Sequence, residues 1–489
     1  MIYAQIPKQV HMPLLPKLTP KKSTWMTELG KHELLEEVIE QFGSPVNIHH
    51  LPSFGSNIKS FENELEKREL KHKILFARKA NKCQGFVVES HKLNQGVDTA
   101  SYNELKECIA LGVDPSQLVV TAAIKEERLL RLAIQNEILL ILDNEDEFIQ
   151  VQKIANELHT DARIGIRVSG FTHEDQKLYS RFGFDIEIVE SFICNNLTSN
   201  KYSALSYEGL HFHLNGYSIS QRGVALNACV ALADRLKEKG YTTHFIDIGG
   251  GFLVNYLESQ QEWEAFDEQL RKAVKGERDE ITHGNNGLGY ELLEGELIGR
   301  LNTYPYYNEV NKSNFMAQVL DYKAEGEKSN AQLLREKGIE IRMEPGRSLL
   351  DQIGMTVARV AFRKQDSKGD WLVGLEMNMT QMRSSSTDFL LDPDVIFKEK
   401  PATNDEVEVY FTGAYCLEQD ILLKRKLSLS KLPDIGDFVM FINTAGYMMH
   451  FYESEAHLFD LATNVFYEKT GDRPALVDFA RDAHVQQLV

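Results

Sequence analysis

The sequence has few cysteines, and none of them forms a recognisable pattern. The chain has 489 residues and five cysteines, an odd number, scattered and without a CxxC motif. A disulfide framework or a cysteine-based zinc site is therefore not expected, and we predict no metal site. Such cysteine usage favours a reducing, cytoplasmic compartment.

Long apolar runs and basic clusters are also lacking. No stretch approaches the roughly 18 apolar residues of a membrane helix, and the N-terminal segment has no signal-peptide pattern. Asp and Glu outnumber Lys and Arg by 72 to 54, which gives a formal net charge of −18. This acidity argues against general nucleic-acid binding, and the lack of a polybasic cluster argues against a lipid surface. The 43% of hydrophobic residues is typical of a globular protein.

From about residue 74 to residue 347, short apolar runs alternate with stretches of helical periodicity. Strands that alternate with helices imply parallel β-α-β units. Eight such units favour an α/β fold with a closed (βα)8 TIM barrel, and an open doubly wound sheet is the alternative. The eight predicted strands are 74–77, 96–100, 117–123, 137–143, 162–168, 209–214, 244–248 and 339–343.

The length predicts two to three domains. We expect the barrel over residues 46–352 and a C-terminal, mostly-β domain over 353–489, where short β-like runs and turn signals take over. Residues 1–45 fit neither pattern and are predicted to pack on the β domain. The interval before the eighth strand is too long for one helix, which indicates an insertion at 262–310. It could cover the active site or extend a dimer contact.

Active sites of TIM barrels lie at the carboxyl ends of the strands. Lys79 follows the first predicted strand, three glycines (249–251) follow the seventh, and Glu344 and Arg347 follow the eighth. A glycine run exposes backbone N–H groups to a phosphate, although a simple tight turn is the alternative. A buried lysine near other cations, here Arg78 and Lys82, has a lowered pKa and becomes a Schiff-base nucleophile. A lysine, a phosphate cradle and a carboxylate for the ring nitrogen are what pyridoxal phosphate requires.

Seven motifs resemble those of the fold-type III pyridoxal-phosphate decarboxylases, the alanine racemase-like group that contains diaminopimelate, ornithine and biosynthetic arginine decarboxylases. The resemblance runs from about residue 45 to residue 455. The motifs are FARKAN (76–81), GVDTAS (96–101), GLHFH (209–213), DIGGGF (247–252), EPGR (344–347), GAYCLEQD (413–420) and NTAGY (443–447).

The resemblance implies a role for each motif. Lys79 would hold the cofactor covalently, and His213 would stack on the cofactor ring. Cys416 would reach the active site of a partner subunit and reprotonate the substrate, so a homodimer with shared active sites is implied. The remaining cofactor-binding residues implied by the resemblance are Asp98, Arg167, Gly249, Gly250, Gly251, Glu344, Gly346, Arg347 and Tyr447. His213 could otherwise be an ordinary core histidine.

Departures from the family pattern concern the substrate and the phosphate. Decarboxylases of basic amino acids carry an acidic residue after the cysteine, but here Leu417 stands there and Glu418 comes one residue later. A leucine leaves an ammonium group unpaired, so we predict a substrate other than a simple basic amino acid, either free or carrier-linked. Glu418 and Arg383 are the candidate substrate-binding residues, the latter for a distal carboxylate.

The segment after His213 lacks the Gly-Ser pair that usually helps to hold the phosphate. That contact would shift to Asn215, Tyr217 or Ser218.

The predicted function is decarboxylation of an amino acid with pyridoxal phosphate as cofactor. A racemase or epimerase on the same barrel is one alternative, but such enzymes place an arginine at the ring nitrogen, where this chain has Glu344. The other alternative is a non-catalytic cofactor-binding protein, in which a β domain carrying Cys416 and Tyr447 would be superfluous.

Overall fold

Eight parallel strands form a closed barrel in the computed structural model, which describes residues 15–197, 201–324, 328–384, 389–399, 406–468 and 479–482. The ring closes because β10 pairs with both β6 and β11, and β14 pairs with both β11 and β2. All eight predicted strands are confirmed, and the alternative of an open sheet is wrong. The barrel strands are β2 (His72–Ala77), β3 (Gly96–Thr99), β4 (Leu118–Val120), β5 (Leu139–Leu142), β6 (Ala162–Ser169), β10 (Leu205–His211), β11 (Phe245–Asp247) and β14 (Glu340–Met343).

The barrel has a packed interior and an outer layer of helices. Leu75, Val119, Leu139, Ile141 and Phe245 form a separate buried cluster of strand residues, as expected for side chains that fill a barrel. The helices around the barrel are α3 (Leu51–Glu66), α4 (Gln84–Lys92), α5 (Tyr102–Ala110), α6 (Glu127–Gln135), α7 (Glu145–Leu158), α8 (Ile186–Asn196), α9 (Ile219–Glu238), α11 (Lys312–Asp321) and α12 (Asn330–Lys337). Three short strands, β7 (Thr172–His173), β8 (Gln176–Lys177) and β9 (Phe184–Asp185), lie between β6 and α8.

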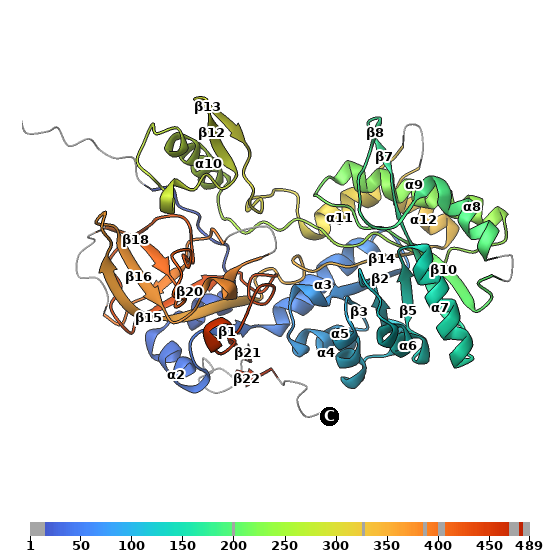
Figure 1. Ribbon diagram of the computed structural model, residues 1–489, viewed down its shortest axis with the longest axis horizontal. Coiled ribbons are helices and arrows are strands. Elements are labelled where there is room, and N and C mark those ends of the chain that lie inside the picture. The colour runs from blue at the N-terminus through green and yellow to red at the C-terminus, as the bar shows by residue number, and fades with distance from the viewer. Residues whose placement is uncertain are drawn as a thin grey trace, which may run out of the picture.

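A second, nine-stranded sheet lies beside the barrel (Figure 1). Its strands are β1 (Val46–His49), β15 (Gly354–Gln365), β16 (Trp371–Leu375), β17 (Asp394–Ile396), β18 (Val407–Thr412), β19 (Leu427–Leu429), β20 (Phe438–Ile442), β21 (Thr463–Tyr467) and β22 (Phe479–Arg481). The predicted mostly-β second domain is confirmed.

The N-terminal helices α1 (Thr24–Leu29) and α2 (His32–Phe42) bury apolar side chains in one cluster with residues of β15 and β20. Strand β1 lies just beyond residue 45 and pairs antiparallel with β15 and parallel with β21. The division of the chain at residues 45 and 352 stays a proposal.

The interval between β11 and β14 contains α10 (Gln260–Val274) and a hairpin of β12 (Tyr290–Leu293) and β13 (Glu296–Gly299). Phe266 and Leu270 of α10 share a buried cluster with Val373 and Val409 of the second sheet. Helix α10 therefore packs on the β domain, whereas α11 and α12 of the same interval belong to the outer layer of the barrel (Figure 1). Among the described residues, no helix has the length and apolarity needed to span a bilayer.

Candidate active site

Lys79 lies in a single 3-10 turn (Arg78–Ala80) directly after β2. Its side chain retains 36% of its accessible surface because it borders a cavity. The neighbouring cation Arg78 points the other way: it is buried, donates to the carbonyl oxygens of Asn81 and Cys83, and pairs with Glu107. The local sequence RKA therefore separates the two charges and leaves only the lysine in the cavity.

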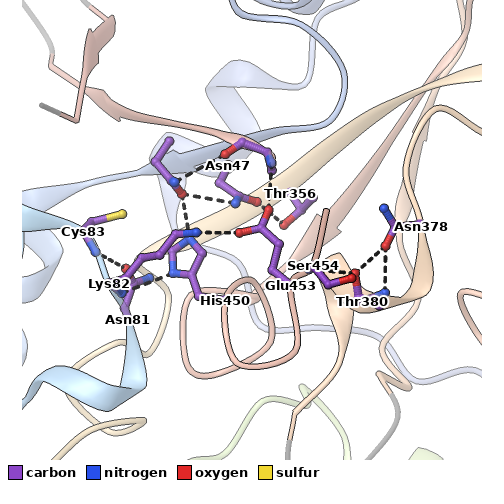
Figure 2. A network of polar contacts seen from close by, with 12 residues as sticks. Asn47, Asn81, Lys82, Cys83, Thr356, Asn378, Thr380, His450, Glu453 and Ser454 are labelled. Carbon is purple, nitrogen blue, oxygen red and sulfur yellow. Dashed lines mark hydrogen bonds and ion pairs between the residues drawn. The ribbon is translucent and has the colours of Figure 1, made fainter. Parts of the chain in front are cut away.

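The β domain holds the turn that carries Lys79. The backbone N–H of Tyr447 donates to the carbonyl oxygen of Ala80 at 2.8 Å, and Asn81 Nδ2 donates to the carbonyl oxygen of Ala445 at 3.0 Å. Figure 2 shows how the next residues continue this contact: the Lys82 N–H donates to His450 Nδ1 at 3.3 Å, and Lys82 Nζ lies 2.6 Å from Glu453 Oε2. The position of Lys79 thus depends on both domains.

The amine of Lys79 lies 3.0 Å from Oδ2 of Asp98, at the end of the adjacent strand β3. Burial lowers the pKa of Lys79, but the carboxylates of Asp98 and Glu344 outweigh burial and raise it above the usual value. The prediction of a lowered pKa is therefore wrong for the chain without its cofactor. The cations that were to lower it, Arg78 and Lys82, are each paired with a carboxylate instead.

Three buried groups, His211, Asp247 and Glu344, meet at the ends of β10, β11 and β14. His211 Nε2 lies 2.9 Å from Glu344 Oε1. Burial opposes ionisation of Glu344, but His211, together with Lys79 and His213, lowers the pKa of Glu344 below its usual range. Burial and the charge of Glu344 raise the pKa of Asp247. Glu344 is therefore the carboxylate of this group that stays ionised.

The glycine run after β11 packs too closely for any side chain. An added Cβ would lie 2.6 Å from His213 Nδ1 at Gly249, 2.4 Å from the Glu344 carbonyl oxygen at Gly250, and 2.4 Å from Arg222 Nη2 at Gly251. The expectation of several free N–H groups is only partly met. Gly249 donates to Asp247 Oδ1 and Gly250 donates to His213 Nδ1, whereas the N–H of Gly251 makes no hydrogen bond with the described residues.

His213 accepts the Gly250 hydrogen bond on Nδ1 at 3.2 Å, which requires that nitrogen to be unprotonated. Burial, followed by the charge of Lys79, lowers the pKa of His213 to about 3. The imidazole is therefore neutral at physiological pH.

Arg347 is held among aromatic rings at the end of β14. Its guanidinium carbon lies 4.4 Å from the ring centre of Tyr304 and 5.2 Å from that of Tyr447. Tyr447 has a φ of +71°, a left-handed conformation that a tyrosine adopts at a cost of about 1 kcal/mol or more. The strained turn brings its hydroxyl next to Gly346, where an added Cβ would lie 2.7 Å from that oxygen.

A cavity of about 870 Å³ opens where these groups meet. Its lining includes Lys79, His213, Gly250, Gly251, Glu344, Gly346, Arg347 and Tyr447 among the predicted site residues, and also Asn215 and Tyr217. Ser218 instead caps α9 by accepting from the N–H of Gln221. Asp98 and Gly249 lie just outside the lining, in contact with Lys79 and His213.

Arg167 and Arg383 do not line this cavity. The Arg167 guanidinium stacks on Phe182, 4.3 Å from the ring centre, and its Nε lies 3.8 Å from Asp143 Oδ1. Arg383 is half-buried, and its backbone N–H donates to the carbonyl oxygen of Met448 at 3.0 Å. Their predicted roles stay predictions.

The loop that carries Cys416 is folded around a buried aspartate. Asp420 Oδ2 accepts from the N–H of Tyr415 at 2.7 Å, and its Oδ1 accepts from the N–H of Met379 at 2.7 Å. This arrangement leaves Cys416 and Glu418 exposed and outside the cavity of their own chain.

Sequence reasoning missed Arg222 on α9. Its side chain is buried and donates from Nη2 to the carbonyl oxygen of Gly216 at 2.9 Å, while Nε and Nη1 have no partner among the described residues. It therefore fixes the segment after His213 and places a positive charge behind Gly251. An arginine in the first turn of a helix that follows a barrel strand was the available signal.

These residues fit pyridoxal phosphate. Glycines 249–251, here called the glycine cradle, leave room where a Cβ would clash. Arg347 and Arg222 supply positive charge beside the cradle, and Lys79 and the ionised Glu344 lie in or beside the same space. The cavity volume also falls within the usual range for small-molecule sites.

Comparisons with known proteins agree with this geometry. The family model described as "Pyridoxal-dependent decarboxylase, pyridoxal binding domain" matches residues 52–286. An "Uncharacterized protein y4yA" from Sinorhizobium fredii is 27% identical over 454 residues, which cover 91% of this chain and 92% of that protein. Diaminopimelate decarboxylase from Staphylococcus aureus is 21% identical over 84% of this chain and 86% of that enzyme.

The crystal structure of diaminopimelate decarboxylase from Helicobacter pylori complexed with L-lysine has the same fold. It matches with a TM-score of 0.66 at 18% identity and covers 92% of this chain and 97% of that one. The match to the pyridoxal-binding domain, the sequence relatives and the residues of the cavity together support a fold-type III pyridoxal-phosphate-dependent decarboxylase, and the solved structure shows the same fold.

Proposed function

We propose that this protein decarboxylates an amino acid, with pyridoxal phosphate as its cofactor, in a homodimer with shared active sites. The observation that carries the proposal is that Lys79, Glu344 and Arg347 border one cavity together with the glycine cradle. When bound, the cofactor provides an electron sink for the bond that breaks at the substrate Cα.

Each of these side chains has a distinct task in the proposal. Lys79 holds the cofactor covalently, and Asp98, which accepts a hydrogen bond from the amine at 3.0 Å, takes the proton that the amine must lose. Glu344 keeps the proton on the ring nitrogen because its carboxylate stays ionised. Neutral His213 covers the ring face, and Arg347 with the glycine cradle binds the phosphate.

Cys416 of the second subunit donates the proton that replaces the lost carboxylate at Cα. The proposal of a dimer is supported by the apolar surface beside this cysteine, where Leu417 is 52%, Leu458 93% and Phe459 40% exposed. Tyr415 stacks on His457 at 5.0 Å and joins the two loops into one surface. Exposed apolar surface of this kind is typical of a protein contact.

The test combines spectroscopy with product analysis. Purified protein loaded with pyridoxal phosphate should show visible absorbance that Lys79→Ala removes and Lys337→Ala, at an exposed surface pair, retains. A panel of L- and D-amino acids that includes diaminopimelate and acidic amino acids is then screened for CO2 release. Release from lysine or ornithine only would contradict the prediction, made from Leu417, that the substrate is not a simple basic amino acid.

Sharing of the active site is tested by mixing variants. Dimers that combine a Lys79→Ala chain with a Cys416→Ser chain should recover activity that neither variant has alone. A monomer in light scattering with full activity would refute the shared site.

Racemisation remains the competing reaction for the same residues. Incubation of amino acids in D2O distinguishes the two, because exchange at Cα without CO2 release would show a racemase or epimerase. The ionised carboxylate of Glu344 supports decarboxylation, since it keeps the ring nitrogen protonated.

A further inference from the structure

The inserted segment between β11 and β14 contributes one wall of the cavity. Residues 300–305 line the cavity together with Lys79 and Arg347. They follow the hairpin of β12 and β13 and return toward the barrel (Figure 1). The insertion therefore takes part in the active site itself.

Hydrogen bonds hold this wall in place. The N–H of Val254 donates to Tyr304 Oη at 2.8 Å, and the N–H of Tyr256 donates to the carbonyl oxygen of Tyr306 at 2.9 Å. Tyr306 Oη in turn accepts from the N–H of Leu390 in the β domain at 3.2 Å. The wall is thus attached both to the segment after β11 and to the second domain.

One cation of this wall has no ion-pair partner among the described residues. Arg300 is exposed at the cavity and forms no ion pair with any described residue.

The lining of the cavity carries more cations than carboxylates. It holds three cations, Lys79, Arg300 and Arg347, but Glu344 is its one described carboxylate. Glu344 is already bound to His211. With Lys79 and Arg347 assigned to the cofactor, Arg300 is a cation without an anion in its own chain, and no described carboxylate of that chain's lining remains for a distal ammonium group.

We propose that Arg300 is a specificity-determining residue, which binds an anionic distal group, such as a carboxylate, on the amino-acid substrate. This inference rests on the proposed function, since it assigns the remaining cavity to an amino acid. The guanidinium binds a carboxylate through two parallel N–H donors.

The test uses the holoenzyme and pairs of compounds that differ only at the distal end. L-2-aminoadipate should be processed in preference to L-lysine, and L-glutamate in preference to L-ornithine. Arg300→Gln should raise KM for the acidic substrate by roughly ten- to hundred-fold, the effect of losing a hydrogen bond to a charged group. Arg300→Lys should restore part of the loss, and Arg335→Gln, at an exposed pair with Glu69, should have no effect.

A binding assay separates this inference from the proposed function. Glutarate and valerate both lack an amine, so neither can react with the cofactor, and they differ only in the distal carboxylate. Glutarate should bind the holoenzyme more tightly than valerate in calorimetry, and Arg300→Gln should abolish the difference. That result without turnover of any amino acid supports the inference and contradicts the proposed function. Equal binding of the two compounds, or an unchanged KM in Arg300→Gln, overturns the inference even if CO2 is released.

Discussion

Replacing Gly250 by alanine tests whether the glycine cradle needs its close backbone contact. The added Cβ would lie 2.4 Å from the carbonyl oxygen of Glu344, whereas an ordinary contact begins at 3.4 Å, so one of the two backbones must move by about 1 Å. Neither moves freely, because β11 and β14 are paired in the closed barrel and the Glu344 N–H donates to Gly249. We expect overpacking to cost about 1–3 kcal/mol.

The cost should appear mainly as weaker cofactor binding, because the cradle can relax only by opening. A penalty of this size corresponds to a rise in the dissociation constant of pyridoxal phosphate of roughly ten- to hundred-fold. Equilibrium dialysis measures that constant, and urea unfolding of the cofactor-free protein measures the free energy of unfolding. Gly55→Ala is the matched control, since its Cβ on α3 meets no atom closer than 3.6 Å. Wild-type cofactor affinity and stability in Gly250→Ala would refute the reasoning.

Three further predictions concern Arg222, His49 and Cys416. Arg222→Met should weaken cofactor binding in dialysis, because it removes the positive charge and the donor to Gly216. It should cause little loss of stability in urea, because the methionine fills the space. Unchanged affinity would exclude a role for the charge of Arg222. Burial lowers the pKa of His49 to about 4, so the unfolded chain binds a proton that the native one does not, and the free energy of unfolding should fall as pH drops from about 6.5 to about 4. Urea midpoints at several pH values should show this slope, and His49→Gln should reduce it; an equal slope in both proteins would argue against His49. Cys416→Ser should retain visible cofactor absorbance but lose most CO2 release, and full activity would exclude the thiol as proton donor.

Much of the site could be predicted because its residues follow strands in sequence. Lys79, the glycine run, Glu344 and Arg347 each come directly after an apolar run, and parallel strands of a barrel all end on one face. The convergence of these residues could therefore be predicted from the order of the strands and from their parallel direction.

The protonation states could not be predicted in this way. Arg78 stands next to Lys79 in the sequence, yet its side chain is buried and paired with Glu107, while Asp98 from the next strand lies beside the lysine. The pKa of Lys79 depends on which charges share its surroundings in space, and these come from β3 and β14 as well as from β2.

The sequence by itself determined the eight strands, the mostly-β character of the second domain and the residues that chemistry requires at the strand ends. These features depend on local periodicity and on residue type, which are visible along the chain. Only the tertiary structure decided that residues 300–305 of the insertion line the cavity and that Arg222 lies behind the glycines. Both placements depend on packing between segments distant in sequence. Which side chains become neighbours is decided only when the barrel closes and packs against the β domain.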